Sequence, residues 1–515
     1  MKIIKAICLC VILLSGMTSV FAQKSEKAFA DGELLVKFKS GVKRSEMARA
    51  NAFVGAQLAE TLGDLNWVRV RIPNGMTVEA AIEYYRKTGE VEAAQPNFYY
   101  RLSATPNDPQ FPNSGMYGLG KISAPAAWDL TTGSTAVVVA DIDTGMRYTH
   151  EDLAANAWTN PGEINGNGVD DDGNGFVDDF YGYDFRFNDS DPLDQHGHGT
   201  HTAGTIGAVG NNGVGVAGVN WNVKLMTIKI YSAGATDSTS AMLVNAYNYV
   251  RLMKERGVNI RVTNNSYGDC PEACGYDQAT KDALDALGAA GVLNVFAAGN
   301  NGRNIDTGAP HYPSSYTLPT ILAVASSTST DARSSFSNFG TTSVDLAAPG
   351  SGIFSTTFGS NSSYGGMSGT SMAAPHAAGA AALLSAYNPN LSVYSLKATL
   401  MNTVDQLAAW NGVVKSGGRL NVLRALQTQT VCSFNLSQTN ILAPTKGGTF
   451  TVNVTSAANC DYAVKSDARW ISVTSDPLLS GNGAVTFRVS TNQVISRTGT
   501  IKIGDQILTV TQSRN

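Results

Sequence analysis

The sequence predicts an α/β domain on a mostly parallel sheet, preceded by a small α+β segment and followed by a small all-β sandwich. Residues 136–143 form an apolar run typical of a buried parallel strand, and the alanine-rich stretch 371–387 is typical of a helix. Beyond Gln429 apolar and polar residues alternate, as in half-buried strands. A chain of 515 residues is too long for one core and suggests about three domains.

The first element is an export signal. Residues 1–22 carry Lys2 and Lys5, then an apolar run over residues 6–14, then the small-residue end Val20-Phe21-Ala22. The run is too short to span a bilayer, and no later segment is long enough to do so. We therefore expect a secreted protein, extracellular or periplasmic, without a transmembrane segment.

The second element, residues 23–104, has its own organisation. Residues 33–38 and 67–70 read as strands, and residues 78–87 read as a helix. The segment is therefore expected to fold as a small α+β unit, and a permanent N-terminal binding domain is one interpretation of it.

The third element is the strand 136–143, which delivers a carboxylate at its end. Asp143 follows Ile142 and precedes Thr144-Gly145. Carboxylates at the C-terminal edge of a parallel sheet are typical of active sites. An aspartate that merely starts a turn is the alternative, and Asp141 is a weaker candidate for the same role.

A histidine cluster comes next. His196, His198 and His201 include half of the six histidines in the chain, and their spacing alone does not select a catalytic base. A zinc site is the rival interpretation, but no nearby cysteine or further ligand completes a tetrahedral set.

Two further segments can serve acyl transfer. Ser371 follows a glycine-rich approach and begins the helical stretch, so its hydroxyl could attack a carbonyl while its own N–H holds the oxyanion. A helix N-cap is the alternative. Asn300 follows the apolar strand 292–296, where its amide could donate to an oxyanion or simply make an Asn-Gly turn.

Four motifs in order resemble those of the subtilisin-like serine proteases: Asp143-Thr144-Gly145, His198-Gly199-Thr200-His201, Ala298-Gly299-Asn300 and Gly369-Thr370-Ser371-Met372-Ala373. The resemblance covers about residues 105–428 and implies the subtilisin-like three-layer fold. It also implies roles: Asp143 orients the imidazole, His198 is the base and then the acid, Ser371 is the nucleophile, and Asn300 helps form the oxyanion hole.

The same resemblance places the substrate. Ser266-Tyr267-Gly268 resembles the strand with which the substrate backbone pairs. Ala297, Ala298 and Gly299 would line the first specificity pocket, and such small residues leave room for a large apolar or aromatic side chain. His311 stands where the family usually has glycine near the pocket floor.

Residues 91–100 resemble the end of a subtilase propeptide. This implies that residues 23–104 act as an intramolecular chaperone and inhibitor, cut off autocatalytically. A large parallel sheet folds slowly, which makes a folding template useful.

An acidic loop predicts structural calcium. It resembles an EF-hand loop in the residues at its ligand positions. Positions one, three and five carry side-chain oxygens, position seven offers a backbone carbonyl, and position nine is acidic. The expected ligands are Asp170, Asp172, Asn174, Phe176 and Asp178. Position twelve is Tyr181 rather than glutamate, and a solvated acidic loop is the alternative. Resemblance to thermitase-like proteases implies a second calcium site at Asp108, Asp152 and Asn212, with Asn211 able to replace Asn212.

Four cysteines remain after the signal. In an oxidising compartment we expect Cys270 to pair with Cys274 and Cys432 with Cys460, each pair within one domain; free thiols are the alternative.

Residues 430–515 resemble BACON-type domains through Cys432, Cys460, a strand at 470–473 and the ending 497–512. The resemblance implies a polysaccharide or surface ligand, although a plain spacer fits the sequence as well. Trp470 alternates with its neighbours like a core residue. The net charge of −4 and pI near 5.9 give no basic patch, so nucleic acid is not an expected partner.

The predicted function is a secreted serine endopeptidase that acts on proteins or peptides through an acyl-enzyme and is made as a zymogen. A transpeptidase on the same scaffold is one alternative. A scaffold or binding protein whose triad serves only self-maturation is another.

Overall fold

The computed structural model describes residues 29–99, 104–111, 114–268, 276–493 and 495–513. These residues form two compact units, which divide after Leu102. No helix among the described residues is long and apolar enough to cross a membrane. The expected export signal lies outside the described residues.

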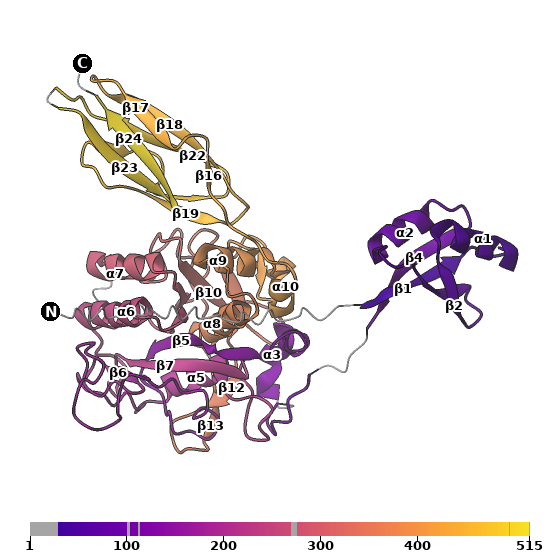
Figure 1. The fold of residues 1–515 in the computed structure, drawn as a ribbon. Coiled ribbons are helices and arrows are strands. Elements are labelled where there is room, and N and C mark those ends of the chain that lie inside the picture. The colour runs from indigo at the N-terminus through magenta and orange to yellow at the C-terminus, as the bar shows by residue number, and fades with distance from the viewer. Residues whose placement is uncertain (1–28, 100–103, 112–113, 269–275, 494, 514–515) are drawn as a thin grey trace, which may run out of the picture. The chain divides into compact units, whose positions relative to one another are not determined.

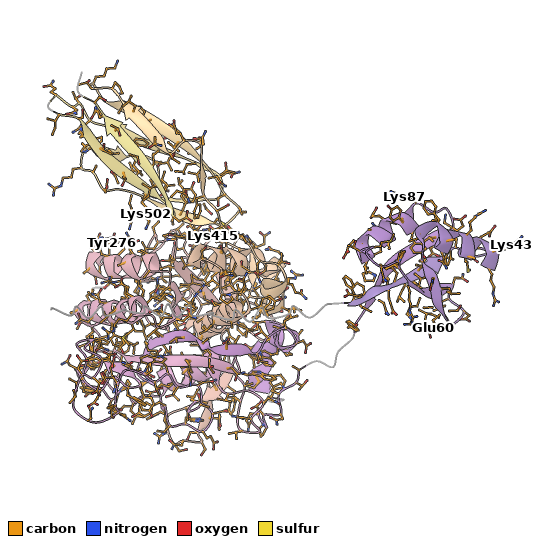
Figure 2. All side chains as sticks on the ribbon, viewed as in Figure 1. Lys43, Glu60, Lys87, Tyr276, Lys415 and Lys502 are labelled. Carbon is orange, nitrogen blue, oxygen red and sulfur yellow. A yellow bond between two sulfur atoms is a disulfide. The ribbon has the colours of Figure 1, made fainter. Side chains whose placement is uncertain are left out.

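The first unit is an α+β fold on one antiparallel sheet (Figure 1). Its sheet has the order β2-β3-β1-β4, with helices α1 and α2 between the strands. Alternate residues of β1, namely Leu34, Val36 and Phe38, are fully buried. Exposed polar side chains such as Lys43, Glu60 and Lys87 point outward from this unit (Figure 2). The elements are β1 Phe29–Phe38, α1 Arg44–Val54, β2 Gln57–Leu62, β3 Trp67–Arg71, α2 Val78–Arg86 and β4 Val91–Phe98.

The second unit is built on a nine-stranded sheet of order β14-β15-β11-β10-β9-β8-β5-β7-β6. From β15 to β6 the neighbouring strands are parallel, and β14 is antiparallel to β15. The strands are β5 Gly133–Asp143, β6 Gly182–Asp184, β7 Asn222–Lys229, β8 Ile260–Asn265, β9 Leu293–Ala297, β10 Ile321–Ser327, β11 Leu346–Pro349, β14 Asp405–Gln406 and β15 Gly418–Arg419.

Helices cover both faces of this sheet, which gives the three layers that the sequence predicts (Figure 1). On β5, Val137 and Val139 face the layer of α5 and α8, whereas Val138 and Ala140 face α6 and α7. Because both faces are covered, the strand is apolar throughout rather than alternating. The helices are α3 Tyr117–Lys121, α4 Ala124–Trp128, α5 His198–Gly207, α6 Ser240–Glu255, α7 Gln278–Ala289, α8 Thr370–Tyr387, α9 Val393–Asn402 and α10 Val422–Gln427.

Helix α8 runs through the interior and has no polar face. All sixteen residues from Thr370 to Ser385 are buried, and seven of them are alanine, so the helix can approach the sheet closely. A short hairpin of β12 Ile353–Thr356 and β13 Tyr364–Met367 precedes it. Two short 3-10 helices, Ser114–Met116 and Ala408–Trp410, complete this part of the unit.

The last residues form a sandwich of two sheets, with orders β16-β18-β22-β20 and β17-β24-β23-β19-β21. Val485, Phe487 and Val489 alternate into its core, as the sequence predicts. Trp470 is only half-buried and stacks beneath the Arg497 guanidinium at 4.3 Å, so it lies at the edge of the core, contrary to the sequence-based expectation. The strands are β16 Asn435–Leu436, β17 Asn440–Ala443, β18 Gly448–Thr455, β19 Asp461–Ser466, β20 Ile471–Val473, β21 Leu478–Ser480, β22 Gly483–Val489, β23 Arg497–Ile503 and β24 Gln506–Gln512.

A buried ionic network joins this sandwich to α9. Lys397 on α9 is 4% exposed, and its Nζ lies 2.9 Å from Asp461 Oδ2 and 3.4 Å from Asp345 Oδ1. Lys415 Nζ also reaches Asp461, at 3.2 Å (Figure 2). Burial raises the pKa of Asp461, but Lys397 and Lys415 outweigh it and lower that pKa to about 2. A disulfide joins Cys432 to Cys460, directly beside this network.

Candidate active site

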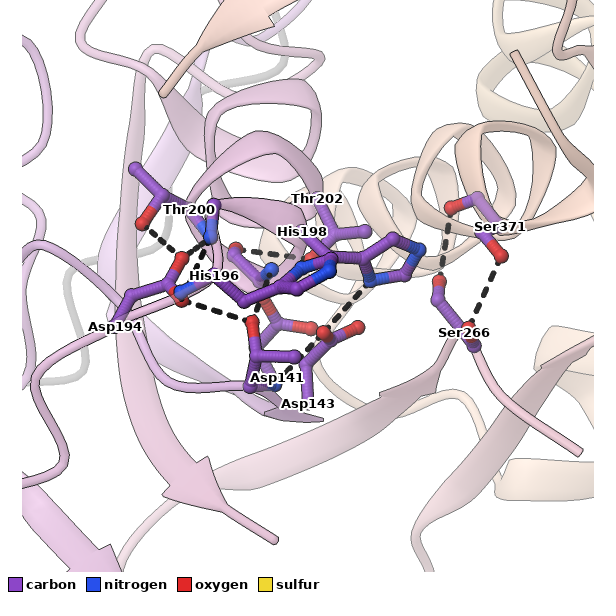
Figure 3. Close-up of polar contacts among 12 residues, drawn as sticks. Asp141, Asp143, Asp194, His196, His198, Thr200, Thr202, Ser266 and Ser371 are labelled. Carbon is purple, nitrogen blue, oxygen red and sulfur yellow. Dashed lines mark hydrogen bonds and ion pairs between the residues drawn. The ribbon is translucent and has the colours of Figure 1, made fainter. Parts of the chain in front are cut away.

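The end of β5 and the start of α5 bring a carboxylate to an imidazole. His198 Nδ1 lies 2.7 Å from Asp143 Oδ1, and that oxygen also accepts the backbone N–H of Thr144 at 2.7 Å (Figure 3). Close approach requires Gly199, because a Cβ there would lie 2.1 Å from the carbonyl oxygen of Gly145. The strand and the helix therefore fix the pair at hydrogen-bond distance.

The three clustered histidines have different surroundings in the structure. His196 is exposed, whereas His201 is buried with its Nε2 3.0 Å from the carbonyl oxygen of Ile353. Burial lowers the pKa of His201 to about 4, which keeps this ring neutral. Burial also opposes protonation of His198, but Asp143 outweighs it, and the pKa of His198 is raised. Of the three rings, His198 is the one paired with the β5 carboxylate.

Ser371 lies in the first turn of α8, and its backbone is tied to β8. Pro375 has no N–H, so it cannot donate to the carbonyl of Ser371 four residues earlier. The Ser266 hydroxyl supplies that donor instead, at 2.9 Å. In return the Ser371 hydroxyl donates to the carbonyl oxygen of Ser266 at 3.0 Å. In the view of Figure 3, His198 stands between Asp143 and Ser371.

Asn300 is oriented by the residue before Ser371. Its Oδ1 accepts both the N–H and the hydroxyl of Thr370, each at 2.9 Å, which leaves the amide Nδ2 as the outward donor. A Cβ placed on Gly369 would lie 3.5 Å from the Ser371 nitrogen and 3.6 Å from Asn300 Nδ2. The two nitrogens therefore lie near one small region of space, as the donors of an oxyanion hole do.

The segments expected to hold substrate follow β8 and end β9. Ser266 is buried, and Tyr267 donates to Asn265 Oδ1 at 2.8 Å. Ala297 and Ala298 are buried. Gly268 and Gly299 have φ values of +148° and +96°.

The imidazole of His311 fills the space between these two glycines. A Cβ on Gly268 would lie 2.5 Å from its Cε1, and a Cβ on Gly299 would lie 2.4 Å from its Cδ2. His311 itself is 3% exposed, with Nδ1 2.8 Å from the Ser314 hydroxyl. The ring thus occupies room that the small neighbouring residues were expected to leave.

The acidic loop uses two of its carboxylates to hold its own backbone. Asp170 and Asp178 accept backbone N–H groups of the loop, from Asn174 and Gly175 and from Asn167 and Gly168 respectively. Their carboxylates hold the turn itself. Phe176 packs its ring against Tyr183 and Tyr249.

A cluster that could hold a cation is formed by Glu163, Asp172 and Asp179, whose ligand oxygens lie within 4.8 Å of one another. Glu163 is 6% exposed, and its Oε2 accepts no hydrogen bond from the residues that the structure describes. Hard oxygen donors of this density suit calcium. Arg256 competes for the site, with Nη2 3.2 Å from Asp172 Oδ1. Sequence reasoning missed Glu163 and Asp179, although Asp179 directly follows the expected Asp178.

The second expected calcium set is brought together. Asn212 Nδ2 donates to Asp152 Oδ1 at 2.8 Å, and the backbone N–H of Asn211 donates to Asp108 Oδ2 at 2.6 Å. Burial raises the pKa of Asp152 to about 7. Cys270 and Cys274 lie outside the described residues.

A half-buried histidine paired with a buried aspartate, together with a serine on a helix N-terminus, agrees with the family comparison. The model of the subtilase family matches residues 134–427, more than half of the chain. The chain belongs to the subtilase family. The model of the fervidolysin N-terminal prodomain matches residues 15–97.

Named relatives agree with this membership. The subtilase is 36% identical to thermitase of Thermoactinomyces vulgaris over 323 residues, which is 63% of this chain and 99% of thermitase. It is 33% identical to a thermophilic serine proteinase of Bacillus sp. (strain AK1) over 400 residues, 78% of this chain and 88% of that protein. A solved structure of proteases from Pseudoalteromonas arctica matches with a TM-score of 0.50 and 28% identity, over 63% of this chain and 99% of that one.

The protein is therefore a subtilisin-like serine endopeptidase with an N-terminal prodomain. The resemblance of residues 430–515 to BACON-type domains stays a prediction.

Proposed function

We propose that this protein is a secreted endopeptidase that cleaves peptide bonds through an acyl-enzyme on Ser371. The observation that carries the proposal is the 2.7 Å contact of His198 with Asp143. It is supported by the backbone nitrogen of Ser371 and Asn300 Nδ2, which lie near one position beside Gly369. An acid-base pair, a nucleophile and an oxyanion site are the parts that acyl transfer needs.

In the proposed reaction, rotation of the Ser371 side chain moves its hydroxyl from the Ser266 carbonyl to His198 Nε2. His198 takes the hydroxyl proton as Ser371 attacks the substrate carbonyl, and Asp143 stabilises the imidazolium. The Ser371 N–H and Asn300 Nδ2 hold the oxyanion. His198 then protonates the leaving amine, and a water molecule activated by the same imidazole releases the acyl group.

The same serine is proposed to free the enzyme from its prodomain. We expect Ser371→Ala to leave the prodomain attached in purified protein, because self-cleavage loses its nucleophile. Ser385→Ala is the matched control, since Ser385 is a buried serine of the same helix whose hydroxyl donates to Ala381. Normal prodomain removal in Ser371→Ala, measured by N-terminal sequencing and intact mass, would refute the proposal.

A second measurement distinguishes an endopeptidase from a transpeptidase and from a protein whose triad cleaves only its own chain. Purified mature protein is incubated with unfolded casein and with a fluorogenic peptide, with and without an acceptor amine. Hydrolysis products support the endopeptidase, ligated products identify a transpeptidase, and inertness toward both substrates identifies a self-limited triad.

The specificity pocket is proposed to lie between segments 266–268 and 297–299. Because the imidazole of His311 lies against both Gly268 and Gly299, it limits the depth of this pocket. The substrate residue on the acyl side of the scissile bond is therefore expected to be smaller than the neighbouring residues alone would admit.

Calcium is proposed to stabilise the loop at Glu163, Asp172 and Asp179. Glu163 Oε2 supports this assignment because a buried carboxylate oxygen without a donor is costly unless a cation faces it. A second ion is proposed at Asp108 and Asp152. Neither ion takes part in the chemical steps.

A further inference from the structure

A second carboxyl group, Asp141, lies behind the Asp143 and His198 pair. Residues two apart on a strand face the same side, so both aspartates of β5 point toward α5. Asp143 meets His198 there, and Asp141 meets Thr202, which lies one helical turn later (Figure 3). Asp141 is 3% exposed, and the reaction steps proposed above do not use it.

The hydrogen bonds from Ser371 back to Asp141 have one consistent direction. The carbonyl oxygen of Ser371 can only accept, so the hydroxyl of Ser266 donates to it, at 2.9 Å. That hydroxyl therefore accepts from Asn264 Nδ2, at 3.1 Å. The second proton of the Asn264 amide goes to Asp141 Oδ1, at 2.8 Å. Oδ1 of Asp141 is thus an acceptor, and only Oδ2 is left to carry a proton.

If Asp141 is ionised, the two hydrogen bonds of the Thr202 hydroxyl have only one proton between them. The hydroxyl of Thr202 lies 2.9 Å from Asp141 Oδ2 and also 2.9 Å from the carbonyl oxygen of Gly199. One hydroxyl proton cannot serve both acceptors well. If Oδ2 carries a proton, Asp141 donates to Thr202 and Thr202 donates to Gly199, so each contact holds one proton.

The charges around Asp141 favour the same state. Asp143 is the neighbouring carboxylate on β5, and two buried carboxylates so close do not ionise together easily. Burial, followed by the charge of Asp143, raises the pKa of Asp141 well above its ordinary value. On β8 the neighbour in register is the neutral Asn264, and on β7 it is Thr227. The other titratable groups on the surrounding elements are His198 and His201 on α5, Lys224 and Lys229 on β7, Arg261 on β8, and His376 and Tyr387 on α8. Of these, Lys229 pairs with Asp184.

We propose that Asp141 is a positioning residue of the active site that works as a neutral acid. By donating to Thr202 and accepting from Asn264, it ties the helix that carries His198 to the residues that hold the Ser371 backbone, without adding a second negative charge beside Asp143. The inference rests on the proposed function, since positioning matters only if His198 and Ser371 react together.

Replacement of Asp141 tests the proton directly. Asparagine can reproduce a neutral acid, with its Nδ2 donating to Thr202 and its Oδ1 accepting from Asn264, whereas valine has neither group. Because misplacement of a reacting group by about 1 Å can cost on the order of 100-fold, we expect Asp141→Val to lower kcat by about 10- to 100-fold with little change in KM. Asp141→Asn should recover at least about tenfold of that loss.

Two threonines of α5 provide a second test variant and its control. Thr202→Val should lower kcat in the same direction as Asp141→Val, because the acceptor for the Asp141 proton is gone. Thr205→Val removes a buried hydroxyl of the same helix that donates to the carbonyl of His201 and does not touch Asp141. This control should leave kcat within about twofold of wild type, since its hydroxyl only back-bonds within the helix.

An infrared measurement keeps the test independent of activity. Full-length Ser371→Ala protein is compared with its Asp141→Asn derivative near neutral pH, where the difference spectrum should contain the carbonyl band of one protonated carboxyl group. Absence of that band, or an Asp141→Asn enzyme no better than Asp141→Val, overturns the proposal. An inactive wild-type enzyme would instead refute the proposed function and leave the infrared result standing on its own.

Discussion

Replacing Asp461 with alanine should destabilise the second unit far more than loss of a surface ion pair would. The change leaves Lys397, 4% exposed, with only Asp345 at 3.4 Å as its partner. Breaking a buried pair costs about 3–5 kcal/mol, and the remaining contact with Asp345 places the expected loss near the lower end, at about 3 kcal/mol. The pKa of Asp461, lowered from 3.8 to about 2, has the same sign, since the folded state favours the ionised carboxylate.

The sign of the pH dependence follows from the depressed pKa. Asp461 stabilises the folded state above its unfolded pKa of 3.8, and this contribution is lost as the pH falls toward about 2. Wild type and Asp461→Ala should therefore differ fully near neutral pH and converge in strong acid.

The assay is urea unfolding in the Ser371→Ala background, which prevents self-digestion. Glu255→Ala is the control, because Glu255 pairs with Arg251 on the exposed surface of α6 at 2.8 Å. Such an exposed helical pair contributes only about 0.3–0.5 kcal/mol. An Asp461→Ala loss no larger than the Glu255→Ala loss would refute the argument that Lys397 depends on Asp461.

Four further outcomes test the active site and the acidic loop. Asn300→Ala should lower kcat by about 100- to 1,000-fold with KM nearly unchanged, because one of two oxyanion donors is lost; an unchanged kcat in steady-state kinetics would contradict this. His311→Gly should raise the kcat/KM ratio of phenylalanine over alanine peptides by about tenfold in a peptide-library profile, and an unaltered profile would place His311 outside the pocket. The kcat/KM value should fall as the pH drops through the raised pKa of His198, since the base must be neutral; an acid limb at or below the ordinary value of 6.5 would contradict it. Glu163→Gln should reduce the calcium-dependent rise in melting temperature while Glu255→Gln leaves it intact, and equal responses of the two variants would remove Glu163 from the site.

The sequence singles out the candidate reacting groups because each one is encoded locally. Asp143 ends an apolar strand, and Ser371 follows glycines at a helix start, so short motifs carry both the residue and its setting. The subtilase fold follows from the same motifs. The choice among His196, His198 and His201 cannot be made from spacing, because it depends on which ring the fold turns toward β5.

The contacts that remained unpredicted join residues far apart in the chain. Glu163 and Asp179 lie close to Asp172 in the structure, but the sequence pattern of residues 170–178 includes neither of them. Their proximity depends on the path of the chain before and after that loop. The pairing of Asp461 with Lys397 likewise requires the docking of one fold on another, which no local pattern records.

The contacts of Lys397 with Asp345 and Asp461 affect where the catalytic domain can be truncated. The subtilase match stops at residue 427, yet one of the two carboxylates that pair with Lys397 comes from residue 461. A fragment cut at the family boundary would therefore keep Asp345 and lose the shorter of the two contacts of Lys397. A module exchanged for the sandwich would have to bring its own carboxylate to Lys397 to restore that contact.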